Sequence, residues 1–215
     1  MNDRPLFKSL LLVTVVLVFP LLLLALNGEL FANQLAHWKI EPPPRGALAL
    51  AIVAILASDV FLPIPSGPVS TLAGSQLGVA LGTAASTLGM TLGAALAFAL
   101  ARRWGRSLAE RYSNPEALAA AEQKCRDHGP WMLALTRPLP IFAEAAALVV
   151  GALRMPWRKF LPPVVTSNLA ISLAYAALGA QAAKQGWLPL ALAATIAAPL
   201  AIALYWRSKL NRTGG

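Results

Sequence analysis

Charged residues, cysteine and histidine are all scarce in this sequence. Only 13% of its 215 residues are charged, against the ~25% that is usual in soluble proteins. Hydrophobic residues make up 57%, which is more than a soluble domain of this size could bury and which also excludes a disordered chain. The composition therefore predicts a small membrane protein whose chain enters the bilayer several times.

The scarcity of metal-binding and nucleophilic residues restricts the possible chemistry. A single cysteine, Cys125, excludes a disulfide framework and a cysteine metal cluster, and the two histidines, His37 and His128, match no ligand spacing. A membrane hydrolase is the alternative class, but it needs a histidine or a paired carboxylate beside a nucleophile. Both histidines lie in or beside loops and no Gly-x-Ser-x-Gly motif occurs. We therefore expect no enzyme activity, no catalytic residue, no metal and no cofactor.

The excess of basic over acidic residues, 18 against 9, has two interpretations. A net charge of +9 is compatible with nucleic-acid binding, but no basic stripe is interleaved with aromatic residues on a polar segment. In a membrane protein the same excess follows from the concentration of lysine and arginine in cytoplasmic loops. We therefore expect membrane lipids, and no nucleic acid, as partners.

Two proline-rich breaks interrupt apolar stretches that are too long for one straight crossing. Residues 47–101 carry one charge, Asp59, and as a single helix they would measure ~80 Å, far more than the ~30 Å hydrocarbon core. The first break follows Asp59, and the second interrupts residues 129–153, whose only charges are Arg137 and Glu144. Proline ends or kinks a helix. The chain is therefore expected to turn back at the prolines of the two breaks, which are Pro63, Pro65, Pro68, Pro138 and Pro140.

A polar stretch, residues 102–128, separates the two broken regions and decides the expected topology. It is predicted to form a surface helix with Asn114 as its N-cap, Pro115 at its first position and Gly129 just past its end. If the first broken region crossed the membrane fully, the basic residues of this stretch would lie opposite the N-terminus, against the positive-inside rule. If instead the first broken region enters and leaves by the outer face and the second by the inner face, 14 basic residues lie inside, three lie outside and Arg137 lies in the membrane. We therefore expect two re-entrant hairpins and two cytoplasmic termini.

The predicted fold is an all-α membrane protein, a single domain over residues 1–215, with an inverted-topology repeat. Each repeat has a re-entrant hairpin followed by a span, and the two hairpins open to opposite faces with their tips meeting near mid-membrane. In chain order, the expected segments are an N-terminal membrane helix (1–27), a hairpin (47–78), a span (79–101), a cytoplasmic helix (106–128), a hairpin (130–153), a span (161–183) and a C-terminal membrane helix (185–206). A cleaved signal peptide is the alternative for the first segment.

Three charges inside the broken regions, Asp59, Arg137 and Glu144, are the first candidates for a functional site. A charge in the membrane interior is costly unless it is paired or hydrated. Arg137 offers a planar fork of donors that matches phosphate oxygens, and a carboxylate in a partly dry cavity takes up a proton more readily, so Asp59 or Glu144 is expected to exchange a proton during transport. The alternative is a structural lock in which Asp59 and Arg137 neutralise one another.

Small and polar residues of the apolar segments are candidates for ligand contact or for packing. Ser66, Ser70 and Thr71, near the first break, and Asn168 and Ser172, in the span from Leu161, are expected either to contact a ligand or to bond backbone and neighbouring helices. Glycines four residues apart let helices approach closely. The expected packing glycines are Gly74, Gly78, Gly82, Gly89 and Gly93.

The same residues resemble the DedA family, the VTT-domain membrane proteins once described as SNARE-associated, over a core of residues 46–180. The resemblance rests on five motifs, which are Asp59-Val-Phe-Leu-Pro-Ile-Pro-Ser66 leading to Ala73-Gly74, Gly93 through Ala101-Arg102-Arg103-Trp104-Gly105-Arg106, Thr136-Arg137-Pro-Leu-Pro140, Gly151-Ala-Leu-Arg-Met155 and Arg158-Lys-Phe160. It implies two opposed re-entrant hairpins and movement of lipids between leaflets, including the undecaprenyl phosphate carrier in bacteria and phospholipids in eukaryotic relatives. It also implies proton coupling for some members.

Two positions depart from the family pattern. Many members carry a glutamate just after the first proline break, where this chain has Ser66 and Gly67, so that Asp59 is the nearest acid. Many carry a second arginine six residues after the position of Arg137, where this chain has Ala143. The expected protein is a divergent member whose lipid can differ from the undecaprenyl carrier.

The expected function is translocation of an anionic lipid, such as undecaprenyl phosphate or a phospholipid, in a bacterial inner membrane. The substrate-binding residues are expected to be Arg137, Ser66 and Asn168, and the charge-coupling residues Asp59 and Glu144. A small-anion or ion transporter on the same scaffold is the first alternative, and a membrane-homeostasis factor without a transport cycle is the second. A homo-oligomer is compatible with the sequence.

Overall fold

The computed structural model describes residues 43–61, 64–105, 115–137 and 140–197. The expected N-terminal membrane helix, Asn114, Pro63 and Pro138 lie outside these residues, as does the C-terminal segment beyond Ala197. All regular elements of the described part are helical. They are α3 (Arg45–Ala57), the 3₁₀ turn η1 (Ser58–Val60), α4 (Ser66–Leu77), α5 (Val79–Leu100), the π-helical turn η2 (Ala101–Gly105), α7 (Pro115–Thr136), α8 (Pro140–Ala152), α9 (Trp157–Gln185) and a last helix, Leu188–Ala197.

The first broken region consists of two short helices followed by a long one. α3 has 13 residues and α4 has 12, and each is shorter than the ~20 residues that a helix needs to cross a bilayer. Gly78, with φ of 82°, turns the chain between α4 and α5. A Cβ atom on Gly78 would meet nothing within 4 Å, so the expectation that this glycine packs a helix interface is wrong. Its role is the positive φ of the turn, which other residues adopt only at a cost.

The second broken region differs from its predicted boundaries. α7 does not end before Gly129 but continues through Pro130 to Thr136. Proline has no N–H, so Pro130 leaves the carbonyl of Arg126, four residues earlier, without its helical partner. Lys159 Nζ donates to that carbonyl at 3.0 Å. Gly129 lies inside α7 and does not end the helix, and it packs against the end of the Met155 side chain.

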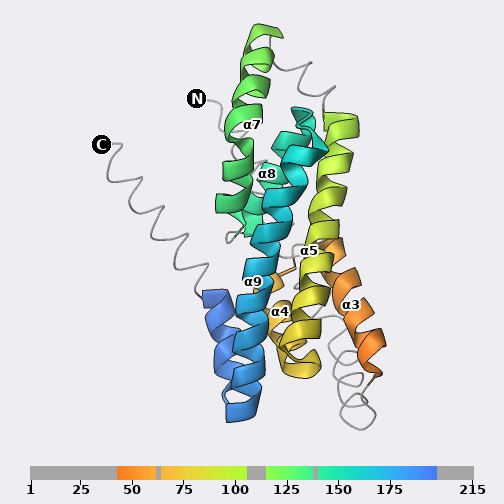
Figure 1. The fold of residues 1–215 in the computed structure, drawn as a ribbon, viewed down its shortest axis with the longest axis vertical. Helices are drawn as coiled ribbons and strands as arrows, with labels where there is room; N and C mark the ends of the chain where they lie inside the picture. The colour runs from red at the N-terminus through yellow and green to blue at the C-terminus, as the bar shows by residue number, and fades with distance from the viewer. Residues whose placement is uncertain (1–42, 62–63, 106–114, 138–139, 198–215) are drawn as a thin grey trace, which may run out of the picture.

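Two long helices form the centre of the bundle. α5 and α9 lie side by side and run in opposite directions (Figure 1). α5 with η2 (Val79–Gly105, 27 residues) and α9 (29 residues) are long and apolar enough to cross a membrane, while Arg45–Ala57, Phe142–Ala152 and Leu188–Ala197 are shorter apolar helices. Gly186, with φ of 77°, ends α9, so the helix expected from residue 185 begins at Leu188.

Each end of the bundle has its own apolar core. One core surrounds Phe98, whose ring stacks on Phe160 at 4.1 Å between centroids, and includes residues from α5, α7, α8 and α9. The other core surrounds Leu56 and joins α3, α4 and α5. α3 and α4 therefore pack at one end of the α5–α9 pair, while α7 and α8 pack at the other end (Figure 1).

Close helix contacts occur where the sequence places glycine. A Cβ on Gly74 would collide with Ala176, and one on Gly179 would collide with the Thr71 carbonyl. On α5, Cβ atoms on Gly82, Gly89 and Gly93 would come within 3.0 Å of Ala73 or Leu56. Because backbone or Cβ atoms form these contacts, no side chain can move aside to admit a methyl group.

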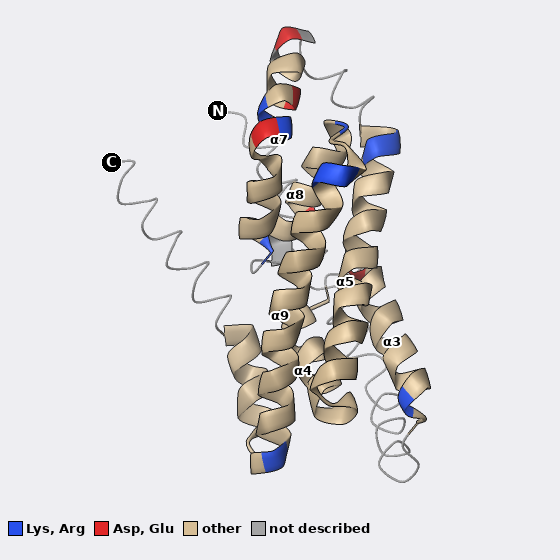
Figure 2. Ribbon diagram, viewed as in Figure 1, with Lys and Arg blue, Asp and Glu red and all other residues tan. Residues whose placement is uncertain are grey.

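Basic residues gather at the α7–α8 end of the bundle. Figure 2 shows lysine and arginine concentrated near the end of α5, the start of α9 and α7, while the opposite end holds the basic residues at the start of α3 and the end of α9. Arg102 Nη1 donates to the Met155 carbonyl at 2.7 Å and thereby joins η2 to the start of α9. The described part of the chain thus carries most of its basic residues at the α7–α8 end of the bundle and few at the α3–α4 end.

Candidate functional site

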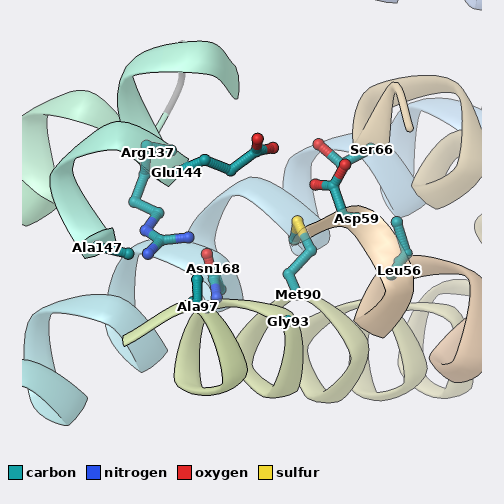
Figure 3. A pocket seen from close by; sticks show the side chains of 12 residues that line it. Leu56, Asp59, Ser66, Met90, Gly93, Ala97, Arg137, Glu144, Ala147 and Asn168 are labelled. Atoms are coloured by element: carbon teal, nitrogen blue, oxygen red, sulfur yellow. The ribbon is translucent and has the colours of Figure 1, made fainter. Parts of the chain in front are cut away.

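Five sequence-predicted site residues line one cavity between the two broken regions. They are Asp59 on η1, Ser66 at the start of α4, Arg137 just after α7, Glu144 on α8 and Asn168 on α9 (Figure 3). The cavity is small, with a volume of about 40 Å³. Its remaining lining residues are apolar, namely Leu56, Met90, Gly93, Ala94, Ala97, Ala143 and Ala147.

Asp59 is positioned by the proline break that follows it. In the sequence Pro63-Ile64-Pro65 only Ile64 has a backbone N–H, and this N–H donates to Asp59 Oδ1 at 2.8 Å. Ser58 Oγ donates to the Ile55 carbonyl at 2.7 Å where α3 ends. The carboxylate therefore satisfies the lone donor of the break, and it also faces the cavity.

Two helices begin at the cavity. α4 starts at Ser66, and α8 starts at Pro140 and carries Ala143 and Glu144 at its N-terminal end. The free N–H groups and the dipole of a helix N-terminus favour negative charge nearby. Both broken regions therefore direct partial positive charge into the same space.

Arg137 presents unpaired donors to the cavity. Its Nε and Nη2 atoms are buried, and among the described residues they have no hydrogen-bond partner. In Figure 3 its guanidinium group extends past Ala147 toward Asn168, whereas the Glu144 carboxylate points toward Asp59 and Ser66. Within the described part of the chain, no ion pair of 4.0 Å or less joins Arg137 to either carboxylate. Arg137 is thus left available for an anion.

Asn168 connects the cavity to the central helix pair. Its side chain is 1% exposed, and Nδ2 donates to Thr91 Oγ1 on α5 at 3.1 Å. Gly93 and Ala97, one turn apart on α5, form the adjacent wall. Because Gly93 and Ala97 have small side chains, they leave room for the cavity beside the polar lining residues.

The sequence reasoning missed the apolar wall of the cavity. Its signal was present, since Gly93 and Ala97 on α5 and Ala143 and Ala147 on α8 are small residues at four-residue spacing. The same spacing is also typical of ordinary helix packing, which is how Gly93 was interpreted. Conversely, Ser70, Thr71 and Ser172 are buried elsewhere in the bundle, outside the cavity lining.

Within residues 43–61, 64–105, 115–137 and 140–197, no group of three histidine, cysteine or acidic residues could hold a metal ion. A family model for the VTT domain matches residues 64–181, which is more than half of the chain. No curated protein and no solved structure matches the chain. The matched region runs from the first break to α9 and includes four of the five polar cavity residues, Ser66, Arg137, Glu144 and Asn168.

Proposed function

Because the chain belongs to the VTT-domain family, the DedA/SNARE-associated membrane proteins, we propose that it moves an anionic lipid between the leaflets of a membrane. The family and the apolar helices identify it as a membrane protein. The proposal further takes the membrane to be a bacterial inner membrane, with both termini in the cytoplasm. The proposal of lipid movement is supported by the cavity between the two broken regions, where the Arg137 donors could bind an anion.

The observation that carries the proposal is the unpaired Arg137 guanidinium. Two of its buried nitrogen atoms have no partner among the described residues, and a buried donor without an acceptor is destabilising. A phosphate oxygen is the acceptor that best fits the planar fork of arginine. The N-terminal ends of α4 and α8 add positive potential at the same place.

The two carboxylates supply a reason for proton coupling. Among the described lining residues, the cavity holds one basic group, Arg137, and two acidic groups, Asp59 and Glu144, whose carboxylates face one another (Figure 3). With both acids ionised, the net charge would oppose an anionic head group. A proton taken up by the Asp59–Glu144 pair removes this opposition, so head-group entry and proton entry occur together.

The proposed topology follows the two broken regions. α3 and α4 form a re-entrant hairpin, and the end of α7 with α8 forms an opposed one, because residues from both breaks line one cavity while each short helix is too short to cross alone. The basic residues at the α7–α8 end face the cytoplasm. This arrangement is an inverted-topology repeat with its site between the halves.

The test is lipid movement in liposomes that contain the purified full-length chain. Fluorescent phosphatidylglycerol is followed by dithionite quenching, with and without a pH gradient. We expect Arg137→Lys, which keeps the charge but loses the fork, to move the lipid at least about tenfold more slowly. Arg158→Lys, an exposed arginine on α9, is the matched control and should leave the rate unchanged.

The same liposomes distinguish the alternatives. If the liposomes take up inorganic phosphate but do not move the lipid, the protein is a small-anion transporter. Movement of neither probe, with or without the gradient, would favour a membrane-homeostasis factor and overturn the proposal.

A further inference from the structure

Most serine and threonine hydroxyls of the described helices belong to one of two groups. Members of the first group donate to a carbonyl three or four residues earlier, which is the usual way to satisfy a hydroxyl in an apolar helix; they are Ser58, Thr71, Ser75, Thr136, Thr166 and Thr195. Members of the second group have buried oxygens that lack any hydrogen-bond partner among the described residues; they are Ser70, Thr83, Ser86, Thr87 and Ser172. We call this second group the hydroxyl column.

The first part of the hydroxyl column lies between α4 and α5. Gly82 on α5 packs against Ala73 on α4, and the two helices are antiparallel because the Gly78 turn joins them. One turn further along α5, Ser86 is therefore level with Ser70. Both residues are 0% exposed, so neither hydroxyl reaches solvent in this conformation.

The second part lies between α5 and α9. Asn168 bonds to Thr91 across these helices, which run in opposite directions (Figure 1). One turn away from that bond, Ser172 on α9 is level with Thr87 on α5. Thr83 lies one turn beyond Thr87 on α5, on the side away from the Asn168–Thr91 bond. α4, α5 and α9 all contact one another, and the two parts are therefore considered together as one column.

The hydroxyl column begins at the cavity. Ser66 and Asn168 line the cavity, and Ser70 and Ser172 lie one turn further along the same two helices. The column therefore leads from the cavity toward the α4–α5 turn, with Thr83 at its far end.

We propose that the hydroxyl column lines a file of water, and that protons travel along it between the α4–α5 face of the membrane and the cavity carboxylates. A dry interface would favour alanine at these positions, because a buried hydroxyl without a partner is destabilising. A buried water bonds about three polar groups, and three helices supply them here. A proton enters from bulk water at the turn, passes by successive hydrogen bonds and ends on a carboxylate oxygen of Asp59 or Glu144. The carboxylate becomes neutral, and its proton is then released toward the opposite face of the membrane.

The hydration can be tested without any transport assay. In the full-length chain with Cys125→Ser, single cysteines replace Thr83, Ser172 and, as control, Val164, which is 0% exposed in the apolar core two turns from Ser172 on the same helix. A small water-soluble methanethiosulfonate reagent is added to proteoliposomes. We expect Thr83→Cys and Ser172→Cys to react at least about tenfold faster than Val164→Cys, since thiolates form poorly in apolar surroundings. Equal, slow rates at all three positions would show a dry packing contact and overturn the proposal.

The proton route, which rests on the proposed function, has its own test. The triple variant Ser70→Ala, Ser86→Ala and Ser172→Ala is compared with Ser75→Ala, a serine that bonds its own helix. After a pH jump, a trapped pH-sensitive dye should report proton entry about fivefold slower for the triple variant than for Ser75→Ala. Entry at equal rates would overturn the role in proton movement. Arg137→Lys should leave cysteine labelling of the column unchanged, so failure of lipid binding and failure of the column are distinguishable.

Discussion

The two broken regions have the same order of elements but opposite chemistry at the break. In the first region, the break carries an acid, Asp59, which already accepts a hydrogen bond from Ile64. In the second, the break carries a base, Arg137, with two buried nitrogen atoms that lack partners among the described residues. The acid of the first break is thus hydrogen-bonded by its own backbone, whereas the base of the second break keeps two donors without partners among the described residues.

The regions also differ in how their short helices are packed. α4 meets α9 through backbone contacts at Gly74 and Gly179, and meets α5 at Gly82. α8 meets α5 through Gly151, whose Cβ would lie 2.6 Å from the Phe98 carbonyl oxygen, and it also contacts α7 and η2. The first region is therefore held from two sides by glycine contacts, and we expect it to be the more rigid half.

The largest effect is expected where α4 and α9 touch. Gly179→Ala places a methyl group against the Thr71 carbonyl, so the two helices must separate, and we expect a loss of about 3 kcal/mol or more of folding stability. Gly46→Ala on α3, where nothing lies within 4 Å, is the matched control and should be neutral or stabilising. Thermal unfolding in detergent measures both. A smaller loss for Gly179→Ala than for Gly151→Ala would reverse the comparison of the two halves.

The next prediction concerns the charges of the two breaks. If Arg137 only neutralises Asp59, the double variant Asp59→Asn/Arg137→Gln should recover both stability and transport, because removing both charges costs less than stranding one. With Arg137 unpaired in the structure, we expect a different result: stability near that of the wild type and lipid movement at least about tenfold slower. A double variant as active as the wild type would show that the site lies elsewhere.

Sequence reasoning found the polar part of the site because an uncompensated charge in an apolar stretch has few explanations. Asp59, Arg137 and Glu144 stand out in any reading of the chain, and the breaks beside them explain why they meet. The end of α7 could not be found in this way. Pro130 normally ends a helix, and it is tolerated here because Lys159, 33 residues from Arg126, bonds the freed carbonyl. Such a contact between distant residues has no local signal.

The proposed opposed hairpins predict that positions in the two regions are labelled from opposite sides of the membrane. Exposed positions are needed, because Cys125 is 8% exposed and burial raises the pKa of its thiol, so at neutral pH it forms little thiolate and reacts slowly. In a Cys125→Ser background, Gln76→Cys at the end of α4 should react with an impermeant thiol reagent added to cells. Lys124→Cys on α7 should react several-fold more slowly until the cells are permeabilised. Labelling of both positions from one side would rule out opposed hairpins.

The smallest effect is expected at Pro130, the proline inside α7. Lys159→Met removes the donor to the Arg126 carbonyl, and we expect a loss of about 1 kcal/mol, because the contact is exposed. In a Pro130→Ala background the restored Ala N–H bonds the same carbonyl within the helix, so Lys159→Met should then cost about half as much or less. Chemical unfolding of the four proteins gives the coupling energy directly. If the cost of Lys159→Met is the same in both backgrounds, Lys159 does not replace the missing helical bond, and the continuation of α7 through Pro130 depends instead on the packing of Gly129 against Met155.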